Sequence, residues 1–190
     1  MKSEYIMRNI IIVLIAASAI FCSSCHFGMD TVTGNGHITT EKRSAAGFTK
    51  VSFGGPFDVV VVPGQDYSVT IEADENLMPY INLDKDGDKL KVKIREGINI
   101  RSKAGIKVRV SMPKVEAIAF AGSGKLKVEG TIRDVDQFEL SVAGSGDIHA
   151  DIDCPRVVAE IAGSGTITAS GKTRDVKVDI AGSGDYKGAD

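Results

Sequence analysis

The sequence predicts an all-β protein whose second half stacks as the rungs of a right-handed parallel β-solenoid. Three observations support this: apolar and polar residues alternate in steps of two, no helical period exceeds one turn, and Ala-Gly-Ser-Gly recurs four times. The chain has 190 residues, of which 21 are Gly. This fraction of Gly exceeds the average Gly content of proteins, which is about 7%. Its 43% hydrophobic content excludes a disordered chain, and its net charge of -2 provides no basic footprint for nucleic acid.

Residues 1–24 are predicted to form a lipoprotein signal peptide. A short segment with two basic residues precedes a run over residues 10–21 that is apolar except for Ser18, which suits a signal-peptide core and is too short to span a bilayer. Met7 is an alternative start to Met1. With either start, the segment lies outside the predicted folded domain.

The apolar run ends in Cys-Ser-Ser-Cys, which is similar to a bacterial lipobox. This similarity implies that a Cys sulfur receives diacylglycerol and that this Cys becomes the first residue of the mature protein. Cys25 is the expected lipidation site because small residues stand directly before it; Cys22 is the alternative, as is ordinary secretion without a lipid. Residues 26–45 are polar and lack a period, so residues 25–45 are predicted to be the lipidated Cys and a flexible tether.

Cys154 is the one thiol left once Cys22 is removed and Cys25 is acylated, so no internal disulfide is expected. It alternates with polar neighbours as a core residue does, which predicts a buried and inert thiol. The stability of the single domain predicted over residues 46–190 must then come from packing.

The first part of this domain, residues 46–112, is expected to contain irregularly spaced strands. Short alternating segments are separated by turns rich in Gly, Pro and Asp. One helical turn is expected over residues 74–80, and Pro79 would end it. The predicted strands cover residues 57–62, 67–72, 89–94 and 106–111.

Residues 113–190 contain the internal repeat, with spacings of 22, 19 and 19 residues between corners. Alignment of the copies places apolar residues two and four positions before the first Gly and four after it, with polar or mixed residues between. Each unit is therefore a strand, a Gly-Ser-Gly corner, a second strand and a short return. A unit of this length cannot bury its apolar face alone, so successive units must stack. The copies occupy residues 121–124, 143–146, 162–165 and 181–184.

The fixed period favours the solenoid over the alternative, an antiparallel β-sandwich, because only a solenoid turns the same corner on every rung. Gly suits such corners since it tolerates positive φ and close approach of two backbones. The Ala before each corner is expected to stack inside the bend, and the Ser hydroxyls are expected to form a hydrogen-bonded ladder; a ligand-binding Ser row is the alternative. The corner residues are Gly122, Ser123, Gly124, Gly144, Ser145, Gly146, Gly163, Ser164, Gly165, Gly182, Ser183 and Gly184, preceded by Ala121, Ala143, Ala162 and Ala181.

Residues 56–64 and 67–77, followed by the Gly-Ser-Gly-Asp series, resemble the family called putative auto-transporter adhesin, head GIN domain. The resemblance covers residues 48–190. It implies an exported envelope lipoprotein with a fold like a right-handed β-helix, and it supplies no established catalytic residues. Members usually continue for further units and a cap, whereas this chain ends at Asp190; we expect either a truncated sequence or a C-terminal edge that contacts another subunit.

Catalysis is the main alternative function, since parallel β-helices include enzymes that act on polysaccharides. Stacking in register would place Glu160 beside Asp179, and Asp147 two rungs from Asp185, with spacings similar to those of glycosidase carboxylate pairs. Any acidic face on a regular ladder gives such pairs, and no His, Arg or Lys joins them in a recognisable constellation. The sequence therefore predicts an outward acidic face and no catalytic residue.

Metal and cofactor sites are not expected. The three His are scattered, no Cys and His spacing suits zinc, and a period of 19 residues excludes a calcium-binding β-roll. Phosphate-binding loops and nucleophile motifs are also absent from the sequence.

The expected protein is a lipid-anchored, non-enzymatic adhesin or binding module of the cell envelope, held at the outer membrane on its surface or periplasmic face. Its expected partners are the membrane, through the N-terminal lipid, and a glycan, a protein or a second copy of the chain. A polysaccharide-acting enzyme and an envelope-stress or assembly partner are the alternatives.

Overall fold

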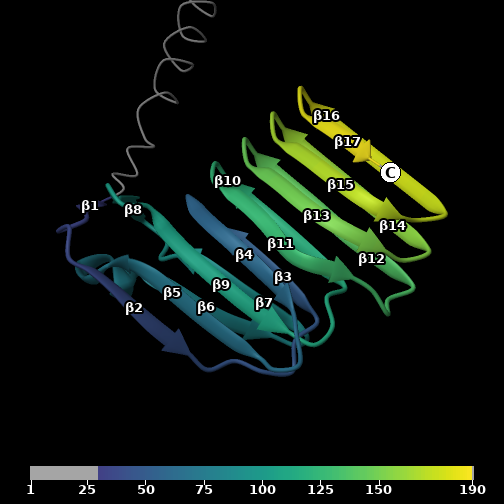
Figure 1. Ribbon diagram of the computed structural model, residues 1–190. Coiled ribbons are helices and arrows are strands. Elements are labelled where there is room, and N and C mark those ends of the chain that lie inside the picture. The colour runs from purple at the N-terminus through teal and green to yellow at the C-terminus, as the bar shows by residue number, and fades with distance from the viewer. Residues whose placement is uncertain (1–29, 190) are drawn as a thin grey trace, which may run out of the picture.

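Two facing β-sheets form the body of the protein, in a computed structural model that describes residues 30–189 (Figure 1). The all-β prediction is confirmed, since the described residues form one short 3-10 helix, η1, and otherwise strands and their connections. The signal peptide and the lipidation predicted at Cys25 lie outside the described residues.

The described elements follow one another in the order β1 (Asp30–Thr33), β2 (Ile38–Arg43), β3 (Lys50–Gly54), β4 (Phe57–Pro63), β5 (Ser68–Asp74), η1 (Glu75–Tyr80), β6 (Ile81–Asp86), β7 (Lys89–Ile94), β8 (Ile98–Arg101), β9 (Ile106–Met112), β10 (Ala117–Gly122), β11 (Lys125–Ile132), β12 (Gln137–Gly144), β13 (Asp147–Asp153), β14 (Arg156–Gly163), β15 (Thr166–Lys172), β16 (Asp175–Gly182) and β17 (Asp185–Ala189).

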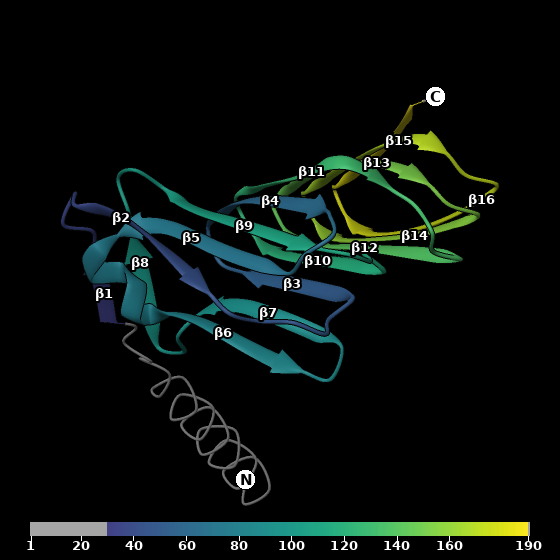
Figure 2. The same ribbon diagram turned by 60° about the horizontal axis from the view of Figure 1, so that its bottom comes forward.

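The seven-stranded sheet has the order β16-β14-β12-β10-β3-β7-β6, and the eight-stranded sheet has the order β17-β15-β13-β11-β4-β9-β5-β2. They form the two layers seen in Figure 2. Because side chains of a strand alternate between its two faces, every second residue points into the space between the layers. β1 and β8 form a separate two-stranded parallel sheet.

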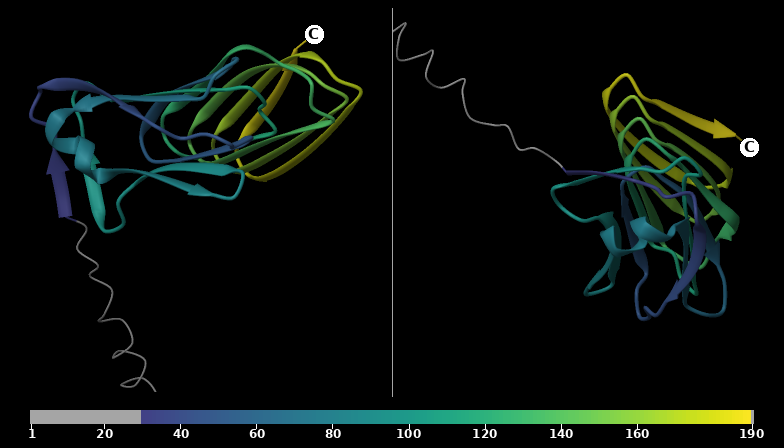
Figure 3. Two further views of the ribbon diagram at one scale, coloured as in Figure 1. Left: turned by 90° about the horizontal axis from the view of Figure 1, so that it is seen from below. Right: turned by 90° about the vertical axis from the view of Figure 1, so that its left-hand side faces the viewer.

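Each Ala-Gly-Ser-Gly unit contributes one strand to each layer: β10 and β11, β12 and β13, β14 and β15, and finally β16 and β17. Equivalent strands of successive units pair in parallel, so that Val142 lies opposite Phe120 and Ile161. This register confirms the parallel stacking predicted from the repeat. Figure 3 shows the units following one another along one axis.

The N-terminal half departs from this simple order. β3 and β4 lie between two pairs of parallel neighbours, with β7 and β9 on one side and β10 and β11 on the other. Beyond β7 and β9, the antiparallel strands β6, β5 and β2 complete the two layers. The rung formed by β3 and β4, which precedes the repeats in the sequence, therefore stands inside the stack.

Two segments of the flexible tether predicted over residues 25–45, residues 30–33 and 38–43, form strands. β1 pairs with β8, and β2 pairs with β5 over residues 38–43. These residues show no period of two because they lie at sheet edges, where both faces of a strand are exposed and backbone hydrogen bonds stabilise it. The described strands begin at Asp30, five residues after Cys25.

The apolar core continues between the layers from rung to rung. Neighbouring rungs place equivalent side chains directly above one another, and the two inner faces supply two facing columns. The column of the seven-stranded sheet contains Phe53, Phe120, Val142 and Ile161, and that of the eight-stranded sheet contains Val59, Leu126, Ile148 and Ile167, all at most 2% exposed. On β16, by contrast, Val176 and Ile180 are each 46% exposed.

Backbone contacts between successive corners require the corner glycines. Gly144, Gly163 and Gly182 have φ of +100°, +122° and +127°. A Cβ on Gly165 would lie 2.5 Å from the Gly146 carbonyl oxygen, and one on Gly184 would lie 2.6 Å from the Gly165 oxygen. The corners therefore use both properties of Gly, positive φ and close approach of backbones.

The serines and alanines at the corners differ from their predicted roles. Backbone N–H groups, not Ser hydroxyls, connect the corners: those of Ser145, Ser164 and Ser183 donate to the first Gly of the preceding unit at 2.8–3.0 Å. The hydroxyls of the corner serines form no hydrogen bond among the described residues. The four alanines do stack, but on the exposed outer face, because each directly follows an inward-facing residue.

Cys154 lies in the turn between β13 and β14 and is buried and free, as the sequence predicts. Its Sγ donates a hydrogen bond to the Arg156 carbonyl at 3.2 Å. Burial raises the pKa of this thiol, which keeps it in its unreactive protonated form.

Asp74 is the one charged side chain that is buried among the described residues. Its carboxylate accepts hydrogen bonds from Gly36 N–H at 2.7 Å and from Ser102 Oγ at 2.6 Å. These bonds connect the loop after β1, the end of β5 and the loop before β9. The hydrogen bond from Ser102, helped by that from Gly36, holds the pKa of Asp74 below its usual value although burial acts to raise it.

Candidate functional site

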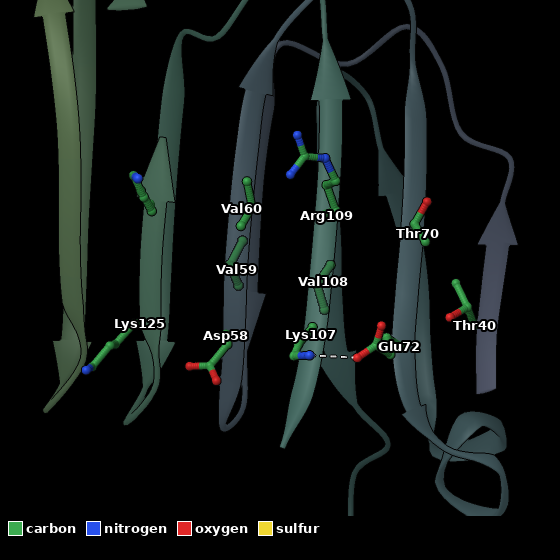
Figure 4. Close-up of a pocket in the computed structure, with 11 residues that line it drawn as sticks. Thr40, Asp58, Val59, Val60, Thr70, Glu72, Lys107, Val108, Arg109 and Lys125 are labelled. Atoms are coloured by element: carbon green, nitrogen blue, oxygen red, sulfur yellow. Dashed lines mark hydrogen bonds and ion pairs between the residues drawn. The ribbon is translucent and has the colours of Figure 1, made fainter. Parts of the chain in front are cut away.

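The outer face of the eight-stranded sheet carries a shallow groove of about 430 Å³. It crosses strands β2, β5, β9, β4 and β11, which the sheet order places side by side. Figure 4 shows its polar side chains standing on neighbouring strands. The groove is lined by Thr40, Asp58, Val59, Val60, Thr70, Glu72, Lys107, Val108, Arg109, Lys125 and Lys127.

Four basic side chains dominate this groove, and two of them are paired. Lys107 Nζ lies 2.7 Å from Glu72 Oε1, and this contact raises the pKa of Lys107 (Figure 4). Arg109 Nη2 lies 2.8 Å from Glu129 Oε2. Lys125 and Lys127 form no ion pair with any residue that the structure describes.

A half-buried apolar residue, Val60, lies in the middle of the groove. Lys127 and Arg109 stand directly beside it on β11 and β9. The groove thus offers positive charge around a small apolar floor, on a face that is open to solvent.

Sequence reasoning missed this groove. The alternating segments Lys125–Glu129 and Ile106–Ser111 contain the signal, since their polar positions all point to one face. The missing information was that β4 stands between β9 and β11, which brings segments from distant parts of the chain together.

The four acidic residues predicted to share an outward face lie on two different sheets. Glu160 and Asp179 are cross-strand neighbours on the seven-stranded sheet. Asp147 and Asp185 lie on the eight-stranded sheet with Thr166 between them. A single acidic face is therefore not formed, because the corner directs the two strands of each unit into opposite layers.

Glu160 and Asp179 border a second groove of about 490 Å³, whose other side chains are mainly small and apolar. Both residues are exposed. Asp179 Oδ2 forms an ion pair with Lys177 Nζ at 2.8 Å.

Within residues 30–189, no three His, Cys, Asp or Glu side chains are grouped so that they could hold a metal ion. Over the same range, no helix has the length and apolar character needed to cross a bilayer.

The fold and the open outer faces define an all-β protein of stacked parallel repeats. The model of the family described as "Putative auto-transporter adhesin, head GIN domain" matches residues 47–190, and the chain belongs to this family. The resemblance seen in the sequence is thereby confirmed. No curated protein matches the chain.

Several solved structures have a similar fold. A putative adhesin from Parabacteroides merdae is 17% identical with a TM-score of 0.51, and the alignment covers 85% of this chain and 100% of that one. A putative adhesin from Bacteroides fragilis is 15% identical with a TM-score of 0.50, over 83% and 100% of the two chains. A putative lipid binding protein from Parabacteroides distasonis is 15% identical with a TM-score of 0.50, over 85% and 100%.

Proposed function

We propose that the protein is a lipid-anchored binding module of the cell envelope without catalytic activity, an adhesin in the broad sense. Family membership supports a cell-envelope or surface protein, and two solved structures of similar fold are described as adhesins. The observation that carries the proposal is the open groove on the eight-stranded sheet, which offers a large ligand several charges that form no ion pair in the part of the chain that the structure describes. We further propose that the stack is a right-handed parallel β-solenoid, since parallel crossovers are nearly always right-handed.

The anchor in this proposal is diacylglycerol on Cys25, in the outer membrane. Asp30 is five positions after Cys25, and a fully extended chain over five residues reaches at most about 18 Å. β1 and β2, drawn in purple, lie at the opposite end of the stack from the yellow β16 and β17 (Figure 3). The anchor would hold the β1 end near the membrane and direct the repeats away from it.

The anchor is tested by substitution of Cys25 with Ala. We expect this variant to lose labelling by radioactive palmitate and to leave the membrane fraction, whereas Cys22→Ala keeps both if the signal is otherwise intact. Labelling and membrane association that persist in Cys25→Ala would contradict the assignment. Protease treatment of intact cells then tells surface display from a periplasmic location.

A polysaccharide-cleaving enzyme is the alternative, with Glu160 and Asp179 as its carboxylates. Against it, both side chains stand exposed on an open face and Asp179 is paired with Lys177, whereas a general acid is usually activated by burial. A glycan array combined with a reducing-end assay separates the two functions. We expect binding without cleavage; cleavage that is lost in Glu160→Gln or Asp179→Asn would establish the enzyme.

Self-association through the C-terminal edge is a further part of the proposal. β16 and β17 each have a paired neighbour on one side only within the described chain, and Val176 and Ile180 are half exposed there. Sedimentation at increasing concentration should show self-association that is weakened by Ile180→Lys. Ile38, which is 45% exposed at the opposite end, provides the control Ile38→Lys. Equal sedimentation of the wild type, Ile180→Lys and Ile38→Lys at every concentration would contradict self-association through this edge.

A further inference from the structure

One row of side chains crosses the whole outer face of the eight-stranded sheet without an acidic residue. The register places these side chains opposite one another on successive strands, one for each strand. We call them the cationic row: Lys42, Thr70, Arg109, Val60, Lys127, His149, Thr168 and Lys187.

The row is long and one residue wide. Its eight strands are separated by seven steps of about 4.8 Å, so it extends over roughly 34 Å. Lys42 and Arg109 are two strands apart, as are Arg109 and Lys127. Lys187 lies three strands beyond Lys127. The four cations are therefore spread along the row at intervals of roughly 10, 10 and 14 Å and do not form a local cluster.

Carboxylates border the row on both sides. The neighbouring row toward the corners contains Glu72, Asp58, Asp147 and Asp185, with Lys107 and Lys125 between them. On the other side stand Glu129 and Asp151. A ligand with negative charge along a narrow line would meet cations in the row, whereas a broad anionic surface would also meet these carboxylates.

We propose that the cationic row binds a linear acidic polysaccharide that lies across the strands. The inference rests on the proposed function of this face as a binding face and specifies the class of ligand. Carboxylates of the polysaccharide would contact Lys42, Arg109, Lys127 and Lys187, and its hydroxyl groups would donate to the bordering carboxylates.

The chemistry of the borders distinguishes this ligand from other polyanions. Asp58, Asp147 and Asp185 are hydrogen-bond acceptors, and each sugar ring of an acidic polysaccharide presents hydroxyl donors beside its carboxylate, whereas an acidic polypeptide presents at most one backbone N–H per residue. Nucleic acid requires a wider basic footprint than a single row on an acidic chain, and the surface of an anionic membrane is broader than the row.

Three lysines of the row are available for such contacts. Lys42, Lys127 and Lys187 are exposed and form no ion pair with other described residues. Arg109 already forms an ion pair with Glu129, so a ligand that contacts Arg109 competes with this pair. The lysines are therefore the residues to substitute.

The test measures binding of the full chain to polygalacturonate by calorimetry, with its methyl ester as the uncharged counterpart. Exposed ion pairs contribute little individually, so the triple variant Lys42→Gln/Lys127→Gln/Lys187→Gln is expected to bind about tenfold more weakly. A matched control variant removes three lysine charges outside the row, those of Lys85, Lys89 and Lys103. Like the row lysines, these residues form no ion pair with other described residues. The triple Gln variant of these residues should bind as the wild type does.

The supporting result is binding to polygalacturonate that exceeds binding to the methyl ester, weakens as salt is added, and depends on the row lysines only. Equal loss in both triple variants would overturn the row as the site. Equally tight binding of polyglutamate, or stronger binding to phosphatidylglycerol vesicles, would overturn the polysaccharide as its ligand.

The outcome can be separated from that of the proposed function. If neutral glycans bind and polygalacturonate does not, the row inference fails and the binding module stands. If no glycan and no envelope protein binds in any assay, both the row inference and the proposed function fail.

Discussion

Gly163 shows how a single residue limits what the repeat can contain. It has a φ of +122°, and a Cβ would collide with the Gly144 carbonyl of the preceding corner. Gly87, in the turn between β6 and β7, has a φ of +60°, and a Cβ added there would meet no atom within 4 Å beyond its chain neighbours. The two glycines therefore separate the cost of positive φ from the cost of close approach.

We predict that Gly163→Ala destabilises the protein much more than Gly87→Ala does. Positive φ alone costs an Ala about 1–2 kcal/mol, whereas a clash with backbone forces neighbouring rungs to shift and should cost roughly 3 kcal/mol or more. Urea unfolding of the two variants provides the comparison. Equal midpoints would show that close approach does not constrain the corner.

Asp74 is a buried carboxylate that has no cationic partner within residues 30–189 and is stabilised by hydrogen bonds. We predict that Asp74→Asn lowers the free energy of unfolding at pH 7 by about 1–3 kcal/mol, because the charged acceptor of two bonds is lost. Asp66→Asn, in an exposed turn, should have little effect.

The same substitution should also change the response to pH. Since the folded pKa of Asp74 is lowered, its contribution is fully present above the unfolded pKa of about 3.9 and is lost as the pH falls through the folded value. The stability difference between wild type and Asp74→Asn should therefore be constant near neutral pH and shrink below about pH 4. A difference that grows on acidification would contradict this account.

Among the elements, the strands of successive units differ chiefly in how many neighbours cover them. Ile161 on β14 and Ile180 on β16 are cross-strand partners in the same column, at 2% and 46% exposure. We predict that Ile161→Ala costs about 2–5 kcal/mol. The identical change Ile180→Ala should cost roughly half of this or less, because the side chain is half in solvent already. Thermal unfolding of both variants measures the difference, and equal costs would show that exposure does not set it.

The sequence predicts the strands and their stacking because both are recorded in local patterns, an alternation of two and a period of 19 residues. It does not predict that β3 and β4 stand between the rung of β7 and β9 and that of β10 and β11, since this order depends on contacts between distant segments. The cationic row was hidden for the same reason: Lys42, Arg109 and Lys127 are far apart in the chain. β1 and β2 were missed because edge strands need no buried face.

In the molecule as a whole, the two ends of the stack are unequal. β6, β5 and β2 cover one end with antiparallel pairing, whereas β16 and β17 have neighbours on one side only among the described residues. In a stack of repeats each rung is stabilised by its neighbours. We predict that backbone amides of β16 and β17 exchange hydrogen fastest among the strands of the two large sheets and those of β3 and β4 slowest, as mass spectrometry can measure. Uniform protection would indicate that the stack opens as one unit.

The position of β3 and β4 inside the stack also has a consequence for folding during the export that we propose, in which the chain emerges from the membrane N-terminus first. By the time Met112 has emerged, β3 and β4 can already pair with β7 and β9 on one side, so a two-rung template exists before the first repeat appears. The first repeat unit, β10 and β11, then pairs with β3 and β4. Each later unit pairs with the unit that precedes it in the sequence. Assembly can thus proceed from the N-terminal rungs toward the C-terminus as the chain emerges, and units gained or lost at the C-terminal end would leave the earlier ones unchanged.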